Sequence, residues 1–273
     1  MQTTTEYSRH AMARMLICLM IALQACQALA ADATYVCPMR GRPCPTTVYP
    51  AAGKCRTCGM ALITQAEYDA LNSKKKHIGI VLYTAFELLD VAGSMEMWGN
   101  VPDFDLITVA EKAGPVSSLQ NATLTAAYSF ADAPKLDIIM VPGGMGTLTE
   151  LANEKMLAFL RERSAQAEIV TSVCSGSALL AKAGVLDGHK ATSNKLYFGL
   201  AKAQSDKVEW IPRARWVDDG KFITSSGVSA GMDMALHLIA RLYTQADAEK
   251  MAKVTEYIWH SNPDDDPFAI AEK

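Results

Sequence analysis

Between residues 77 and 262 the sequence alternates short, almost continuously apolar runs with segments of helical spacing. Strands that are buried on both faces give such runs, and in parallel sheets the connecting helices cover both faces. The alternation therefore predicts an α/β fold, a doubly wound sandwich with a mainly parallel sheet. The predicted strands are residues 77–83, 104–110, 136–141 and 168–173.

The predicted helices and turns complete this domain. Helical spacing covers residues 87–98 and 154–167, and Asn153 is placed to cap the second of these helices. Residues 207–210 and 215–224 are predicted to form edge strands or a hairpin, and two closing helices are expected at 230–243 and 246–259. A tail follows from residue 263 to 273, with Asp264, Asp265 and Asp266 expected in a solvated acidic turn.

The first thirty residues have the pattern of an export signal. Arg9 and Arg14 precede an apolar run at residues 15–25, and the segment closes with Ala28-Leu29-Ala30. This arrangement predicts a signal peptide over residues 1–30 and a protein secreted into the periplasm. A membrane anchor is the alternative, although the run is shorter than the ~20 residues that span a bilayer. Lipidation at Cys26 is a further alternative.

Charge and cysteine distribution narrow the classes of partner. The net charge is -3 and no long basic block is present, so no nucleic-acid partner is expected. After residue 30, four of five cysteines fall within residues 37–58 and the fifth is Cys174. A cluster of four and a single thiol in an exported chain indicate two separate roles.

The cluster of four cysteines predicts a small metal-binding module at residues 31–66, followed by a linker at 67–76. Its candidate ligands are Cys37, Cys44, Cys55, Cys58, Met39 and Met60. So short a segment buries little apolar surface and needs a metal or disulfides to fold. Thiolates and thioethers suit copper(I), and four thiolates suit zinc equally well. Two structural disulfides are the alternative.

The module resembles a known family at both of its ends. The segments Y-V-C-P-M and G-K-C-R-T-C-G-M-A-L resemble the heavy-metal-binding domain at the N-termini of copper and other heavy-metal transport proteins. The resemblance implies that the module binds a heavy-metal ion. Arg40 stands where that family has a histidine, and arginine cannot ligate a metal. We infer that Cys44 replaces the missing ligand.

The segment Ser172-Val173-Cys174-Ser175-Gly176-Ser177 predicts a reactive cysteine. A buried strand passes through small residues into a helix, which is the arrangement of a nucleophile elbow with cysteine in place of serine. The helix N-terminus stabilises negative charge, so the pKa of the Cys174 thiol is expected to lie below the usual ~8.5. A buried structural cysteine at the end of a core strand is the alternative.

Two other segments follow predicted strands and are expected near Cys174. Gly143 and Gly144, in the segment V-P-G-G-M-G, are expected to offer backbone N–H groups to a ligand or an oxyanion. Asp90 lies in an apolar setting just past the first strand, where partial desolvation would raise its pKa and suit it to proton transfer. A helix N-cap is the alternative role for Asp90.

Together these segments resemble the ThiJ/PfpI superfamily over nearly all of residues 77–262. The resemblance implies a flavodoxin-like fold, and L-L-D-V-A-G and V-C-S-G-S are most similar to the isonitrile-hydratase-like branch. By that resemblance Asp90, Cys174 and Ser175 are the catalytic residues, and a homodimer is expected. The protease branches have a histidine at the position of Ser175, so proteolysis is not expected. Asn194 stands where several other branches have a histidine.

Two functions remain open at this point. The first is a cysteine-dependent hydratase or hydrolase: Cys174 adds to a small electrophilic carbon, isonitrile- or aldehyde-like, and water releases the product. The large domain needs no cofactor for this chemistry. The second is a non-catalytic periplasmic protein that binds metal or a ligand, or that senses redox state at Cys174.

Overall fold

The computed structural model of the chain describes residues 34–38, 44, 46–72 and 75–270. The chain divides into two compact units between residues 74 and 75. The predicted signal peptide and Met39 lie outside the described residues. Within the described ranges, no helix combines the length and the apolar character that crossing a membrane requires.

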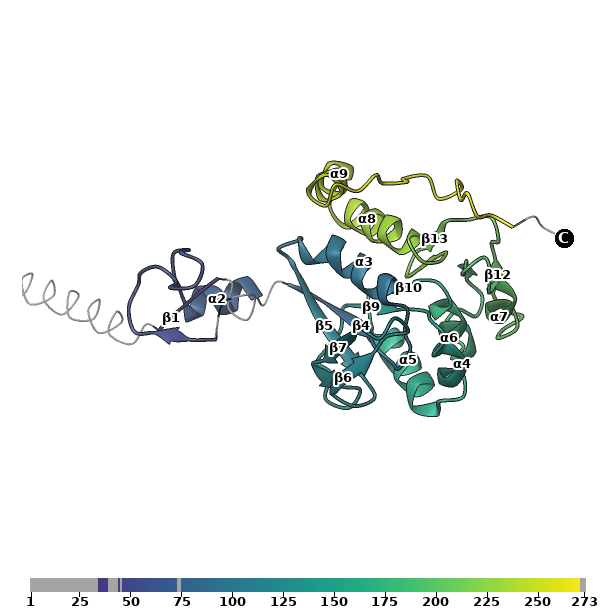
Figure 1. Cartoon of the computed structure of the whole chain (residues 1–273), viewed down its shortest axis with the longest axis horizontal. Helices are drawn as coiled ribbons and strands as arrows, with labels where there is room; N and C mark the ends of the chain where they lie inside the picture. Colours follow the sequence, from purple (N-terminus) through teal and green to yellow (C-terminus); the bar gives the residue numbers. More distant parts are fainter. Residues whose placement is uncertain (1–33, 39–43, 45, 73–74, 271–273) are drawn as a thin grey trace, which may run out of the picture. The chain divides into compact units, whose positions relative to one another are not determined.

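The small unit is a three-stranded antiparallel sheet followed by one helix (Figure 1). Its strands are β1 (Tyr35–Val36), β2 (Val48–Tyr49) and β3 (Ile63–Thr64), in the order β2-β1-β3, and the helix is α2 (Gln65–Asn72). The helix covers the first part of the predicted linker. A buried cluster in this unit consists of Cys37, Cys44 and Cys55, with Leu62 packed against it. Cysteine sulfur therefore takes the place that a larger apolar core has in bigger domains.

The large unit is built on a seven-stranded sheet in the order β13-β14-β10-β9-β4-β5-β8. The strands are β4 (Lys76–Val81), β5 (Phe104–Ala110), β8 (Tyr128–Ser129), β9 (Ile138–Val141), β10 (Ile169–Ser172), β13 (Trp216–Asp219) and β14 (Phe222–Ser225). All neighbours are parallel except the antiparallel pair β13 and β14. Every residue of β9, β10 and β14 is buried. The mainly parallel, doubly wound sheet predicted from the apolar runs is confirmed.

Two groups of helices cover the sheet, and Figure 1 shows them on opposite sides of the strands. On one side α3 packs on α8 and α8 packs on α9; on the other α4 and α5 pack on α6. The helices are α3 (Leu88–Gly99), α4 (Thr147–Glu150), α5 (Glu154–Gln166), α6 (Gly176–Lys182), α7 (Phe198–Lys202), α8 (Ala230–Leu242) and α9 (Gln245–Val254). The side chain of Asn153 caps α5 by accepting from the N–H groups of Lys155 and Met156, as predicted.

Smaller strands were not predicted or were placed differently. A hairpin of β6 (Gly114–Ser117) and β7 (Thr123–Ala126) follows β5, and its exposed four-residue strands lack the apolar runs that mark the main sheet. β11 (Lys190–Ala191) and β12 (Glu209–Trp210) form a separate parallel pair. The predicted hairpin at residues 215–224 is present, but only β13 is an edge strand because β14 pairs with β10.

The C-terminal part of the large unit differs from the prediction in two ways. The last helix ends at Val254, because Glu256 adopts a left-handed φ of 50° and the chain turns back toward α8. The predicted solvated acidic turn is also wrong for Asp266, whose side chain is fully buried. Lys195 and Arg215 are buried beside it, each 3.6 Å away, and their charges require a nearby anion.

Candidate active site and metal centre

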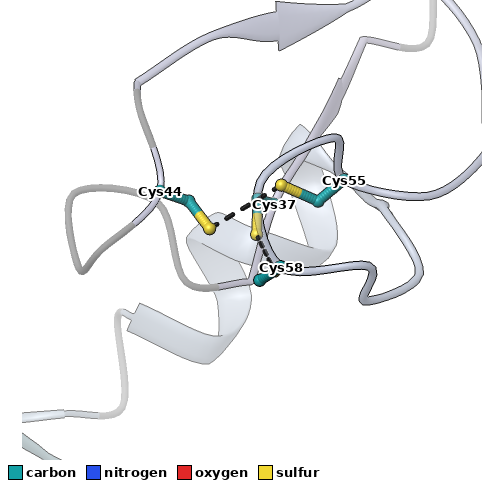
Figure 2. A group of neighbouring side chains, drawn as sticks. All are labelled: Cys37, Cys44, Cys55 and Cys58. Atoms are coloured by element: carbon teal, nitrogen blue, oxygen red, sulfur yellow. Dashed lines mark hydrogen bonds between the residues drawn. The ribbon is translucent and has the colours of Figure 1, made fainter.

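The small unit brings the four predicted cysteine ligands together. Their sulfur atoms all lie within 4.8 Å of one another, and Figure 2 shows the side chains converging from separate turns of the chain. The Cys37 and Cys58 sulfurs are 3.5 Å apart, and those of Cys44 and Cys55 are 3.7 Å apart. A tetrahedral zinc site with Zn–S bonds of about 2.3 Å places its sulfurs about 3.8 Å apart. The four thiols therefore fit a tetrathiolate metal site, and none of them is in a disulfide.

The Cys55–Cys58 segment is folded as a metal knuckle. The carbonyl of Cys55 accepts from Gly59 N–H at 2.9 Å, and Gly59 has a φ of 74° that favours glycine. The backbone N–H groups of Cys58 and Thr57 lower the pKa of Cys55 to about 6, which favours the thiolate that a metal requires. Met60 is 45% exposed, and its role as a further ligand stays a prediction.

In the large unit, Cys174 lies at a strained turn between β10 and α6. Its φ is 59°, a left-handed conformation that costs a non-glycine residue about 1–2 kcal/mol. Four backbone contacts hold it there: Cys174 N–H donates to Ser226 O at 3.2 Å, and Cys174 O accepts from Ser177 Oγ at 3.2 Å and Ser193 Oγ at 3.1 Å, while the preceding N–H bonds to β9. The predicted nucleophile elbow is present.

Asn194 donates a hydrogen bond to the sulfur of Cys174. Its Nδ2 lies 3.1 Å from Cys174 Sγ, and its Oδ1 accepts from the N–H groups of Leu196 and Tyr197 at 2.9 and 3.1 Å. Because those two donors fix the oxygen, the NH₂ group must face the sulfur. Asn194 thus orients the thiol without the ability to take its proton.

Asp90 is buried beside the elbow in the first turn of α3. Its Oδ2 accepts from Gly143 N–H at 2.8 Å, while its Oδ1 is buried with no hydrogen-bond partner among the described residues. Burial raises the pKa of Asp90 well above its usual value, and the Gly143 N–H bond, followed by contact with the Cys174 thiol, offsets part of this effect. Glu87 holds the N-cap position of α3, so Asp90 is not the cap of this helix.

Burial, and then the nearby charge of Asp90, raise the pKa of the Cys174 thiol. The Ser175 backbone N–H and the Asn194 amide offset only part of that rise. The lowered pKa expected at the elbow is therefore wrong, because the N-terminus of a seven-residue helix does not outweigh desolvation and a neighbouring carboxylate. Both shifts favour the protonated form of each group, compared with an exposed carboxyl or thiol.

Ser175 and the two glycines are bound to one another. Gly144 N–H donates to Ser175 Oγ at 3.2 Å, and Gly143 N–H is taken by Asp90. A Cβ at Gly143 would lie 2.5 Å from Ser175 N, so only glycine allows this approach. The N–H groups of Gly143 and Gly144 were expected to bind a ligand, but in this structure they donate to the side chains of Asp90 and Ser175. Ser175 Oγ also lies 3.0 Å from Thr147 Oγ1, which lies 3.0 Å from Tyr83 Oη.

A cavity of about 280 Å³ opens onto Cys174. Its lining is mostly apolar, and Glu87 is the charged residue in it. The lining residues are Glu87, Leu119, Gly144, Met145, Leu148, Cys174, Ser175, Asn194, Tyr197, Leu200 and Val228. Among the described lining residues there is no histidine. His189 and His237 instead pair with Asp219 and Asp218, each at 2.8 Å. Such a cavity suits a small molecule with an apolar substituent.

Residues 76–241 match the DJ-1/PfpI family, and residues 34–65 match the heavy metal binding domain. The chain belongs to the DJ-1/PfpI family. Isonitrile hydratase from Pseudomonas putida is 34% identical over 202 residues, which are 72% of this chain and 87% of that protein. The crystal structure of a ThiJ/PfpI family protein from Pseudomonas syringae is 34% identical and superposes with a TM-score of 0.62, over 71% of this chain and 77% of that one.

A transcriptional regulator, GbdR of Pseudomonas aeruginosa, is 30% identical over 176 residues, and this chain spans about half of its length (47%). In the DJ-1/PfpI domain of this chain, sequence reasoning found Asp90, Cys174 and Ser175, and the fold brings them together. It missed Thr147 and Tyr83. Tyr83 ends the first predicted strand, and Thr147 directly follows the V-P-G-G-M-G segment. Only the fold links their hydroxyl groups to that of Ser175.

Proposed function

We propose that the DJ-1/PfpI domain is a cysteine-dependent hydratase that acts on a small isonitrile with an apolar substituent. The observation that carries the proposal is the Cys174 sulfur at the floor of an apolar cavity, held by Asn194 and beside the buried carboxyl of Asp90. Similarity to an isonitrile hydratase over most of the chain supports the same chemistry. An aldehyde is the second candidate substrate class.

The raised pKa values of Asp90 and Cys174 favour a reaction that starts from two neutral groups. Asp90 transfers its proton to the terminal carbon of the isonitrile, and the sulfur of Cys174 bonds to the same carbon. The thiol proton passes to the Asp90 carboxylate, which restores the carboxyl group. The product is a thioimidate, R–N=CH–S–Cys174, formed by adding S–H across the carbon without an oxidant or a reductant.

Water then releases the product. Its oxygen bonds to the thioimidate carbon, one proton goes to the nitrogen, and the intermediate is R–NH–CH(OH)–S–Cys174. Cleavage of the carbon–sulfur bond gives the formamide R–NH–CHO, and the hydroxyl proton returns to the sulfur. The Asn194 amide, 3.1 Å from the sulfur, stabilises the charge that develops on it as it leaves. The net reaction adds one water to one isonitrile.

The test measures formamide production from an alkyl and an aryl isonitrile in ¹⁸O-labelled water by mass spectrometry. Wild-type protein is expected to place the label in the formyl oxygen, and Cys174→Ser is expected to lose turnover because the serine hydroxyl is a far weaker nucleophile. A matched panel of aldehydes tests the second substrate class. Reduced wild-type protein that converts neither class, or Cys174→Ser with wild-type turnover, would contradict the proposal.

The raised pKa of Cys174 disfavours the alternative function in redox sensing. Oxidation to a sulfenic acid proceeds through the thiolate, which burial and Asp90 hold at a low population. A sensor would accumulate one oxidised Cys174 per chain on peroxide treatment and show no turnover. Peptide mass spectrometry after peroxide treatment distinguishes the two functions.

For the small unit we infer a bound zinc or copper(I) ion held by Cys37, Cys44, Cys55 and Cys58. The sulfur spacing and the match to the heavy metal binding domain support it. Such an ion would hold the turns of this unit together, and the chain around it supplies little other buried apolar surface. We also propose export to the periplasm. Metal analysis and intact mass of the protein purified from that compartment test both proposals.

A further inference from the structure

Three hydroxyl groups form a hydrogen-bonded chain from the core of the large unit to the cavity. Tyr83 Oη donates to the carbonyl of Pro142 at 2.7 Å and lies 3.0 Å from Thr147 Oγ1. Thr147 Oγ1 lies 3.0 Å from Ser175 Oγ, and Ser175 lines the cavity. Tyr83, Thr147 and Ser175 are all buried, so water does not compete for these bonds.

The three hydroxyl groups can make all of these hydrogen bonds at once in only one donor-to-acceptor direction. A carbonyl only accepts, so the single hydrogen of Tyr83 is used on Pro142. Thr147 must then donate to Tyr83, and its own hydrogen is used. Ser175 must in turn donate to Thr147. Each hydroxyl has one hydrogen, so none is left on Ser175 for the cavity or for the sulfur.

The acceptor capacity of Ser175 is counted in the same way. Its oxygen has two lone pairs, and Gly144 N–H occupies one of them at 3.2 Å. One lone pair remains, and Ser175 is one of the residues that line the cavity. Toward a ligand, Ser175 is therefore an acceptor and not a donor.

We propose that Tyr83 and Thr147 are positioning residues that turn the Ser175 hydroxyl away from Cys174 and present its remaining lone pair to the attacking water. A water that donates to this lone pair beside the sulfur has its oxygen free to bond to the carbon held by Cys174. The role of the water rests on the proposed hydratase function. The direction of the hydrogen bonds does not, and it can be measured without turnover.

The pKa of the Cys174 thiol reports the direction of the hydrogen bonds that link Tyr83, Thr147 and Ser175. The Ser175 side chain lies within hydrogen-bonding reach of the Cys174 sulfur, and a hydrogen bond from Ser175 lowers the pKa of the thiol. Other groups facing this region are Asp90 from α3, Glu87 at the start of α3 and Tyr83 after β4, with Glu150 of α4 acting on Tyr83. Variants of Thr147 leave all of these charged groups unchanged.

The experiment measures the rate of Cys174 alkylation by iodoacetamide against pH in the full-length protein, with peptide mass spectrometry separating Cys174 from the other cysteines. In Thr147→Val the Ser175 hydrogen is released and turns to the sulfur. The apparent pKa of Cys174 is then expected to fall by about one unit, which is about a ten-fold faster reaction at a fixed pH below it. Thr147→Ser keeps the hydroxyl and is expected to retain the wild-type profile.

A double variant separates this effect from a change in packing. In a Ser175→Ala background, Thr147→Val is expected to leave the alkylation profile unchanged, because no hydroxyl is left to redirect. Tyr83→Phe removes the acceptor for Thr147, lets Thr147 donate to Ser175, and is expected to lower the apparent pKa as Thr147→Val does. Tyr83→Phe is the variant to measure if Thr147→Val does not fold.

A wild-type profile in folded Thr147→Val and Tyr83→Phe would overturn the inference, as would a shift that persists without the Ser175 hydroxyl. If the shift appears in a protein that hydrates no isonitrile, the hydrogen-bond direction stands and the hydratase function fails. If formamide is produced but the profile does not move, the hydratase stands and the positioning role fails.

Discussion

Replacing Asp90 by asparagine is expected to make Cys174 more reactive to alkylation while it abolishes turnover. The side chain is fully buried, and an asparagine oxygen can still accept from Gly143 N–H in the position that Oδ2 holds at 2.8 Å. What the substitution removes depends on pH. Above the pKa of Asp90 it removes the carboxylate charge that raises the pKa of Cys174, and below that pKa it removes the proton that the isonitrile carbon would receive.

The magnitude follows from the contact between the two groups. A charge within a few ångströms shifts a neighbouring pKa by about 1–3 units, or about 1.4–4 kcal/mol. At a fixed pH at which Asp90 is ionised and Cys174 is still mostly protonated, the thiolate fraction of Cys174 is therefore expected to rise about 10- to 1000-fold. Loss of a general acid lowers turnover by about 10²- to 10⁴-fold. Asp90→Asn is therefore expected to raise the alkylation rate of Cys174 and to lower turnover.

The assay compares the pH profile of Cys174 alkylation with formamide production in the same preparations. Glu87→Gln is the matched control: it removes a carboxylate that lines the same cavity and acts on Asp90 but is not among the main causes of the raised pKa of Cys174. Glu87→Gln is expected to change both readouts far less. Asp90→Asn that alkylates no faster than wild type would refute the account of the thiol pKa. Wild-type turnover in Asp90→Asn would refute its role as proton donor.

Three stability measurements and one metal titration test four other features. Because the folded-state pKa of Asp90 is raised, the wild type is expected to lose unfolding free energy relative to Asp90→Asn as pH rises from 3.8, which denaturant titrations across pH would show. Gly143→Ala should cost at least about 1–3 kcal/mol, since its Cβ meets Ser175 N at 2.5 Å. Asp233→Asn, which removes the carboxylate bonded to the buried Arg215 at 2.6 Å and leaves it only Asp266 at 3.6 Å, should cost about 3–5 kcal/mol in the same assay. Cys44→Ser should lower zinc affinity of the small unit at least ten-fold in a competition titration, and unchanged affinity would exclude Cys44 as a ligand.

The fold was predictable because its signals are local. A strand buried on both faces needs a continuous apolar run, so β4, β5, β9 and β10 could be located within two residues at each end. The elbow was predictable for the same reason: small residues directly after a buried strand permit the left-handed turn that Cys174 adopts. The β6–β7 hairpin was not, because its short, exposed strands have no such run.

The electrostatic properties of the site were less predictable. The segment around Cys174 contains a helix N-terminus, and by itself that feature lowers a thiol pKa. The fold adds burial and the carboxyl of Asp90, which comes from a helix 84 residues earlier in the chain, and these reverse the direction. Asp266 is a similar case, since its neighbours in sequence are acidic and exposed but its neighbours in space are Lys195 and Arg215.

The amino-acid order alone established the two-part organisation, the parallel sheet, the four clustered cysteines and the single elbow thiol, because each depends on residues close together in the chain. Folding established the raised pKa values of Asp90 and Cys174, the hydrogen bond from Asn194 to the sulfur and the direction of the Tyr83–Thr147–Ser175 hydrogen bonds. These depend on burial and on which distant groups meet, and both arise only when the sheet and its helices pack.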